Sequence, residues 1–121
     1  AGGKWRFVQR VAWWSEYAEA PAVVVGHYWR RMLAGDAAAH GPQAENLFGH
    51  TGPLAWLGAR GNVFCVDYSV GARWAARRNG EDPGRRFKLA ALRWPERQLV
   101  FDDGVQAATA GFGVANAHAA A

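Results

Sequence analysis

The sequence contains one cysteine, Cys65, so no disulfide can form within the chain. This excludes the small secreted domains that depend on disulfides, and it fits a reducing cytoplasm. No stretch approaches the roughly 20 apolar residues that a membrane-spanning helix needs, and the amino terminus has no apolar run behind a basic segment, as a signal peptide would. We therefore expect a soluble, cytoplasmic protein with no membrane partner.

Lysine is also scarce. Twelve arginines and only two lysines supply the positive charge of a chain whose net charge is +4. The planar guanidinium group suits recognition of phosphate or carboxylate, although most surface arginines serve only solvation. The chain has 121 residues, of which 50% are hydrophobic and 13% aromatic. This composition is typical of one small ordered domain.

Two short apolar runs each lead into polar residues. The first, at residues 22–25, is rich in valine and is followed directly by Gly26-His27. The second, at residues 62–66, ends at Asp67. Both runs predict buried strands that end in a loop.

The segments before and between these runs have weaker signals. Trp13 and Tyr17 are spaced to share one helical face, which favours a short helix within residues 11–20 that ends at Pro21. Residues 34–53 are rich in Gly, Ala, Pro, His and Asn without clear periodicity. We expect a long loop or mobile insertion there.

The last third of the sequence predicts a β-hairpin. Turn residues at 79–83 follow an Arg-rich segment at 73–78. Residues 87–94 and 98–101 are typical of two strands joined by a tight connection. The Ala- and Gly-rich tail, residues 105–121, is expected to be disordered.

His27 is the sharpest candidate for a functional residue. A histidine directly after a strand and a glycine lies where loops of layered α/β folds gather to bind ligands. Imidazole is a common metal ligand, and Gly26 allows a sharp bend of the backbone. The alternative is a strand-end histidine bonded to a backbone carbonyl. His50 also follows a glycine, but no β-branched run precedes it.

The order of these motifs resembles a known family. Val-Val-Val-Gly-His at residues 23–27 is similar to the strand-Gly-His motif of calcineurin-like metallophosphoesterases. Gly-His-Tyr-Trp-Arg at 26–30, Gly-Asn-Val-Phe-Cys-Val-Asp-Tyr-Ser-Val-Gly at 61–71 and Leu-Ala-Ala-Leu-Arg-Trp-Pro-Glu at 89–96 resemble a bacterial branch of that family, near the phosphoprotein phosphatases and diadenosine tetraphosphatases. The resemblance spans residues 3–104.

The resemblance implies an α/β (α+β) fold. Residues 1–104 would form the C-terminal portion of a four-layer αββα metallophosphoesterase sandwich, β-rich and with a terminal hairpin. The family's Gly-Asp-x-His, Gly-Asp-x-x-Asp and Gly-Asn-His motifs do not precede residue 26. We therefore expect the last third or so of a longer enzyme, with the missing N-terminal part of the domain as its partner.

In the full enzyme, the resemblance implies two divalent metal ions, Mn²⁺, Fe or Zn, that activate a water for hydrolysis of a phosphate ester. Phosphomonoesters, phosphoproteins and dinucleoside polyphosphates are the expected substrates. His27 would be the one metal ligand of this chain. Because such sites take three or more protein ligands per metal, the chain alone should bind metal poorly and be inactive.

Four further residues lie close to these two strand ends in the sequence. Arg30 is placed to meet a substrate phosphate, or else forms a solvated pair with Arg31. Asp67 and Tyr68 are candidates for a supporting role behind the metal ligands, although an Asp that bonds its own turn is the plainer interpretation. Cys65 is expected in the core rather than as a nucleophile.

Two other functions stay open. In a small basic nucleic-acid-binding module, tryptophans would stack on bases and arginines would bind phosphates; the arginines in question are Arg73, Arg77, Arg78, Arg85 and Arg86. Nucleic acid is not the expected partner, because the charge excess is modest. The chain could also be a non-catalytic fragment that pairs with a separate N-terminal half.

Overall fold

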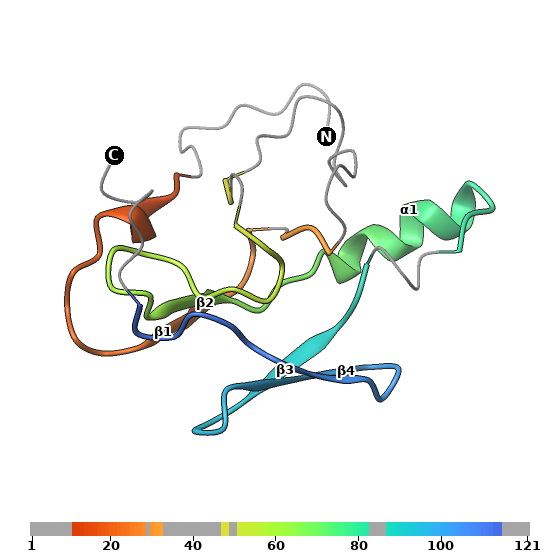
Figure 1. Ribbon diagram of the computed structural model, residues 1–121. Coiled ribbons are helices and arrows are strands. Elements are labelled where there is room, and N and C mark those ends of the chain that lie inside the picture. The colour runs from red at the N-terminus through yellow and green to blue at the C-terminus, as the bar shows by residue number, and fades with distance from the viewer. Residues whose placement is uncertain (1–10, 29, 33–46, 49–50, 83–86, 115–121) are drawn as a thin grey trace.

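The computed structural model describes residues 11–28, 30–32, 47–48, 51–82 and 87–114, and within them the chain has a mixed α+β fold with few helical residues (Figure 1). None of the helices described is long and apolar enough to cross a membrane. The elements are the 3₁₀ turn η1 (Trp13–Ser15), strands β1 (Val23–Val25) and β2 (Val63–Cys65), the 3₁₀ turn η2 (Val70–Ala72), helix α1 (Arg73–Arg78), and strands β3 (Ala90–Arg93), β4 (Gln98–Phe101) and β5 (Gln106–Ala108).

The two predicted strands are confirmed: the valine-rich run forms β1, and the run that ends at Asp67 forms β2. They pair in parallel. Val23 of β1 lies opposite Val63 of β2, and Val25 lies opposite Cys65. All of β2 is buried, as expected. The expectation of a buried strand is wrong for β1, because Val24 is 48% exposed. Among the described residues β1 pairs only with β2, so one edge of β1 has no neighbouring strand there.

Strand β2 lies between two core clusters, because alternate side chains of a strand point to opposite faces. Val63 and Cys65 pack into the first cluster, and Phe64 packs into the second. The first cluster is completed by Trp14, Phe48 and Leu57, and the second by Trp56, Tyr68, Leu99 and Phe101. Burial on both faces explains why the β2 segment is a nearly continuous apolar run.

The predicted β-hairpin is confirmed by β3 and β4, which pair antiparallel with Ala90 opposite Phe101 and Arg93 opposite Gln98. The connection runs through Pro95-Glu96-Arg97, where the N–H of Arg97 donates to the carbonyl of Arg93 at 2.8 Å. Leu99 of β4 is fully buried in the second cluster. The hairpin therefore closes one side of that cluster.

The first part of the tail beyond residue 104 is ordered, in contrast to the expected disorder. Strand β5 pairs antiparallel with β4, with Gln98 opposite Ala108. Beyond it, the N–H of Ala110 donates to the carbonyl of Leu54 at 2.9 Å. Composition indicated disorder because the side chains are small, but here backbone hydrogen bonds to β4 and to residue 54 supply the order. Residues 115–121 lie outside the described residues.

The helix expected within residues 11–20 is reduced to the single 3₁₀ turn η1. The side-chain amide nitrogen of Asn62 lies within hydrogen-bond distance of the carbonyls of Glu19, Ala20 and Pro21, at 2.8, 3.3 and 3.1 Å. These carbonyls face Asn62 instead of extending a helical ladder. The Arg-rich segment forms the short helix α1, and most of the expected 34–53 loop lies outside the described residues.

Gly61 allows the segment before residue 115 to pack against the start of β2. Its φ is +65°, and a Cβ there would clash with backbone atoms of Val114 and Gly111. The N–H of Gly113 donates to the Gly61 carbonyl at 2.9 Å. Gly104 has a comparable φ of +86° but nothing within 4 Å of an added Cβ.

We predict that Gly61→Ala lowers the free energy of unfolding by about 3 kcal/mol and Gly104→Ala by about 1 kcal/mol. Both changes place Ala in the left-handed region, so the difference between them isolates the backbone clash at Gly61. Urea unfolding followed by tryptophan fluorescence measures both values. Equal losses would mean that residues 111–114 do not pack on Gly61.

An ion pair connects α1 to the turn after β4. A guanidinium nitrogen of Arg73 lies 2.6 Å from a carboxylate oxygen of Asp102, and Arg73 Nε donates to the carbonyl of Phe87 at 2.8 Å. The hydrogen bond from Arg73, with further help from the N–H of Leu89, lowers the pKa of Asp102 from 3.8 to about 2. The carboxylate is therefore favoured in the folded chain.

We predict that this ion pair makes stability depend on pH below about 4. Because the folded pKa of Asp102 is depressed, its contribution is complete above the unfolded pKa and is lost as pH falls through about 2. Wild type should therefore be more stable than Asp102→Asn at pH 5, and the difference should shrink towards pH 2. Urea midpoints of both proteins across this range test it; a difference that does not change with pH would contradict it.

Candidate functional site at the carboxyl ends of β1 and β2

The parallel register brings two predicted site residues to the same edge of the sheet. Val25 lies opposite Cys65, and the N–H of Val66 donates to the Val25 carbonyl at 2.9 Å. His27 and Asp67 each follow two residues after this pair. A Cβ added at Gly26 would lie 3.9 Å from the Cβ of Asp67, so the two loops are in contact.

His27 is exposed at this edge. Its φ is +73°, which is left-handed and uncommon for a residue with a side chain. Ser69, in the loop after β2, also has a left-handed φ of +64°. Both strand-end loops therefore contain a strained residue, and such strain is found most often where a structure positions functional groups.

Asp67 bonds its own turn, which was the plainer of the two interpretations. Its Oδ1 accepts a hydrogen bond from the N–H of Ser69 at 2.9 Å, and its carbonyl accepts one from the N–H of Arg30 at 2.8 Å. Both bonds fix the loop that follows β2. Asp67 can thus support this edge through its turn, and it remains partly exposed beside the His27 loop.

Tyr68 lies in the second core cluster rather than at the strand-end surface. It is fully buried, and its hydroxyl donates to the carbonyl of Pro53 at 2.6 Å. Burial raises the pKa of Tyr68 well above its ordinary value of 10, so the neutral phenol is the form that the core holds. Its position fits a packing role.

Arg30 is a core residue in the described structure. It is 1% exposed, and its guanidinium donates to the carbonyls of Cys65 at 3.0 Å, Gly52 at 2.8 Å and Ala55 at 2.5 Å. The guanidinium carbon also lies 4.9 Å from the ring centroid of Phe64. Burial lowers the pKa of Arg30. With its donors turned inward, Arg30 is not presented to a substrate phosphate.

Sequence reasoning missed this role because an Arg-Arg doublet has no local signal of burial. The informative signal is not local: the carbonyl acceptors lie 22 to 35 residues away. The core position expected for Cys65 is confirmed, since it is fully buried and burial raises the pKa of its thiol. His50, which competed with His27, lies outside the described residues.

The described residues contain no group of three or more His, Cys, Asp or Glu side chains that could hold a metal ion. At the strand-end edge, His27 and Asp67 are the residues of suitable chemistry. A catalytic divalent metal usually takes three or more protein ligands. The edge can therefore contribute part of a metal site but needs ligands from elsewhere to complete one.

Comparison of the chain with family models, with curated proteins and with solved structures found no match. The metallophosphoesterase resemblance therefore stays a prediction that depends on the motifs themselves.

We predict that Arg30→Met destabilises the fold by about 3 kcal/mol, because it leaves buried carbonyls without donors. Arg31→Met, at the partly exposed neighbouring position, should change the free energy of unfolding by less than about 0.5 kcal/mol. Urea unfolding of the two variants tests the prediction. If Arg30→Met were as stable as Arg31→Met, the guanidinium would not hold the core together.

Proposed function

We propose that this chain is the C-terminal portion of a metal-dependent phosphoesterase, with His27 as one metal ligand. The observation that carries the proposal is the parallel register of β1 and β2, which brings His27 and Asp67 to one edge of the sheet. Ligand sites of α/β sheets gather at the carboxyl ends of parallel strands. The order strand-Gly-His, strand-Asp, turn and hairpin also supports it.

In this proposal, the imidazole of His27 binds one metal through a ring nitrogen. Its left-handed backbone turns the chain immediately after β1, and the residue is exposed. Asp67 holds the neighbouring turn through its bond to the Ser69 N–H. The metal pair, when bound, would supply an activated water and neutralise charge on the phosphoryl oxygens.

The remaining ligands would come from the N-terminal part of the same domain. The edge of β1 away from β2 is where further strands would add, since β1 pairs only with β2 among the described residues. A three-residue edge strand has little stability of its own. The four-layer αββα sandwich is thus proposed as the fold of the complete domain. The substrate class is a phosphate ester, whether phosphomonoester, phosphoprotein or dinucleoside polyphosphate.

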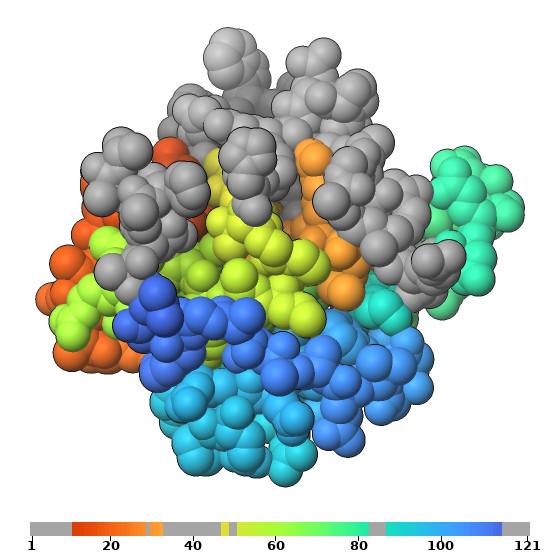
Figure 2. All heavy atoms as spheres, viewed as in Figure 1, coloured from red at the N-terminus to blue at the C-terminus, as the bar shows by residue number. Residues whose placement is uncertain are grey.

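A nucleic-acid-binding module is the second candidate, and one feature favours it. Trp74 on α1 is 66% exposed, and the guanidinium of Arg78 lies 4.7 Å from the centroid of its ring. Figure 2 shows the end of α1 as a lobe that projects from the body of the protein. Against it, Arg73 is engaged by Asp102. Binding of single-stranded DNA that weakens steeply with salt and ignores metal would favour this candidate.

We predict that Mn²⁺ binds the isolated chain weakly and broadens the NMR amide signals of Gly26, His27 and Asp67 before all others. His27→Ala should abolish this local broadening, because it removes the only imidazole at the edge among the described residues. His50→Ala is the matched control and should leave it unchanged. Broadening centred elsewhere and indifferent to His27→Ala would overturn the assignment of His27.

The proposed phosphoesterase activity is tested with the longer protein that the extended reading frame would encode. The DNA upstream of the Ala1 codon should encode Gly-Asp-x-His and Gly-Asn-His motifs, and the resulting protein should hydrolyse p-nitrophenyl phosphate with Mn²⁺. In that protein His27→Ala should lower kcat/KM by about 100-fold or more. Hydrolysis by the isolated chain would contradict the need for a partner segment; a frame that stops at once would favour the non-catalytic fragment that pairs with a separate N-terminal half.

A further inference from the structure

The loop that carries His27 is anchored by the residue that follows it. Tyr28 is half-buried, and its ring packs on the first core cluster. The ring meets Trp14 edge to face, with the ring centroids 5.3 Å apart and the planes at 88°. Its hydroxyl accepts a hydrogen bond from the indole Nε1–H of Trp13 at 3.0 Å. The turn η1, which lies outside the sheet, therefore holds the side chain next to His27.

The donor of this hydrogen bond is itself held in place. The ring of Trp13 contacts the ring of Trp14, with centroids 5.8 Å apart, and that of Tyr17, with centroids 6.0 Å apart. An indole has a single N–H, and its direction is fixed by the ring. The bond from Trp13 therefore fixes the position of the Tyr28 hydroxyl, in addition to the packing of its ring.

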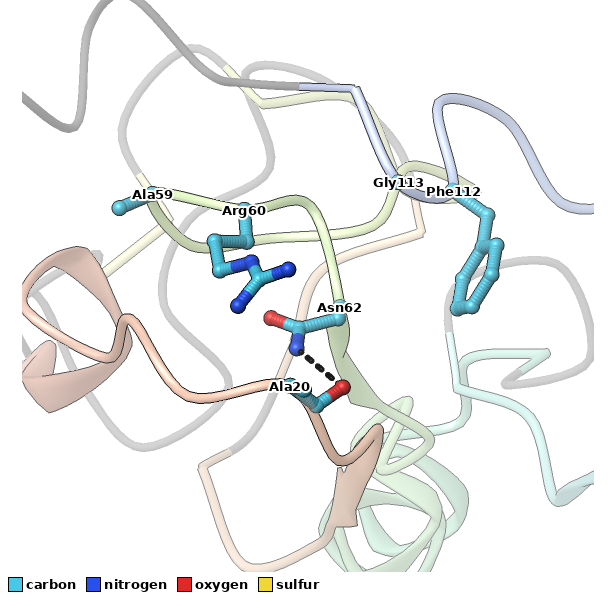
Figure 3. A pocket seen from close by; sticks show the side chains of 6 residues that line it. All are labelled: Ala20, Ala59, Arg60, Asn62, Phe112 and Gly113. Carbon is cyan, nitrogen blue, oxygen red and sulfur yellow. Dashed lines mark hydrogen bonds between the residues drawn. The ribbon is translucent and has the colours of Figure 1, made fainter.

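The segment between η1 and β1 is also tied to the sheet. Asn62 directly precedes β2, and its amide nitrogen lies 2.8 Å from the carbonyl oxygen of Glu19 and 3.3 Å from that of Ala20. The second of these contacts is drawn in Figure 3. Nη1 of Arg60 donates to the carbonyl of Ala18 at 3.1 Å. These bonds make η1 a fixed support for the loop after β1.

Two anchors bracket the exposed residues Gly26 and His27. Before them lies Val25, which is paired with β2, and after them comes Tyr28. The left-handed φ of +73° at His27 is unfavourable for a residue with a side chain. Such a conformation persists only where the surrounding structure fixes it. The two anchors meet this requirement and set the direction in which the His27 side chain leaves the backbone.

We infer that Tyr28 is the positioning residue for His27, and that it acts through the hydrogen bond from Trp13. This role rests on the proposed function of His27 as a metal ligand, because a ligand must be oriented to meet an ion that other groups also hold. Without the bond, the loop can relax towards an unstrained backbone, and only a fraction of the molecules would hold His27 in the binding orientation. The apparent metal affinity falls in proportion to that fraction.

Tyr28→Phe tests the inference, because phenylalanine keeps the ring and removes only the acceptor of the bond from Trp13. Tyr17→Phe is the matched control: Tyr17 packs on the same cluster, but its hydroxyl donates to the carbonyl of Pro21 at 2.9 Å. In Tyr28→Phe, the indole N–H signal of Trp13 should shift. The strong NOE between Hα and H–N of His27, which a left-handed residue gives, should weaken. Tyr17→Phe should leave both unchanged, and neither measurement requires a metal.

Metal binding gives the second measurement. The apparent dissociation constant for Mn²⁺, obtained from the broadening of the His27 signal, should rise about fivefold in Tyr28→Phe and stay the same in Tyr17→Phe. Trp13→Phe removes the donor of the same bond and should have the same effect. The double variant with both Trp13→Phe and Tyr28→Phe should bind Mn²⁺ about as weakly as either single variant.

An unchanged His27 NOE in Tyr28→Phe, or a Trp13 indole signal that does not move, would overturn the inference. A double variant in which the two single losses of affinity add in full would also overturn it. If the wild type binds no Mn²⁺ at this edge while the His27 NOE still weakens in Tyr28→Phe, the proposed metal site fails and the positioning of His27 by Tyr28 stands.

Discussion

The buried guanidinium of Arg30 is the interaction on which the arrangement of this chain depends. It joins the end of β2, through Cys65, to the loop at Gly52 and Ala55. Its main chain adds two more links, because its N–H donates to the Asp67 carbonyl and its carbonyl accepts from Ser69 Oγ at 3.0 Å. Moving a charge from water into a core is unfavourable unless other groups replace the water.

Here carbonyl oxygens replace the water at the two terminal nitrogens and aromatic faces lie beside the group, while the buried Nε has no hydrogen-bond partner among the described residues. The rings of Phe48, Phe64 and Tyr68 have centroids 5.4, 4.9 and 5.8 Å from the guanidinium carbon. Phe48 belongs to the first core cluster and the other two to the second. Arg30 therefore contacts both clusters across β2 and also fixes the turn that holds Asp67. The strand-end edge with His27 and Asp67 is thus positioned in part by Arg30, which the sequence analysis considered as a residue that binds substrate phosphate.

Much of the secondary structure could be predicted, because it is encoded locally. The β-branched run of β1, the apolar run of β2 and the turn of the β3–β4 hairpin each have a short-range signal. What failed depended on distant partners. The exposure of Val24 depends on which distant segments cover β1, and β5 is ordered by pairing with β4.

The candidate site was predictable in part for the same reason. Gly26-His27 and Asp67 carry a local strand-end signal, and the parallel register brings them to one edge. Arg30 and Tyr68 lie equally near in sequence, yet both are buried. Whether a side chain after a strand turns outward or into the core depends on which carbonyls and rings surround it, and these belong to residues distant in sequence, such as Gly52 and Phe64 for Arg30 and Phe101 for Tyr68.

The left-handed backbone of His27 is an observation that supports the proposed role of the edge. Such a conformation is unfavourable by about 1–2 kcal/mol for a residue with a side chain, and a glycine would avoid it. Of the three left-handed non-glycine residues described, His27 and Ser69 both lie in the loops after β1 and β2. Stability alone would not favour histidine at an exposed, strained position. An imidazole that binds a metal together with ligands from elsewhere in the domain would give the strain a function.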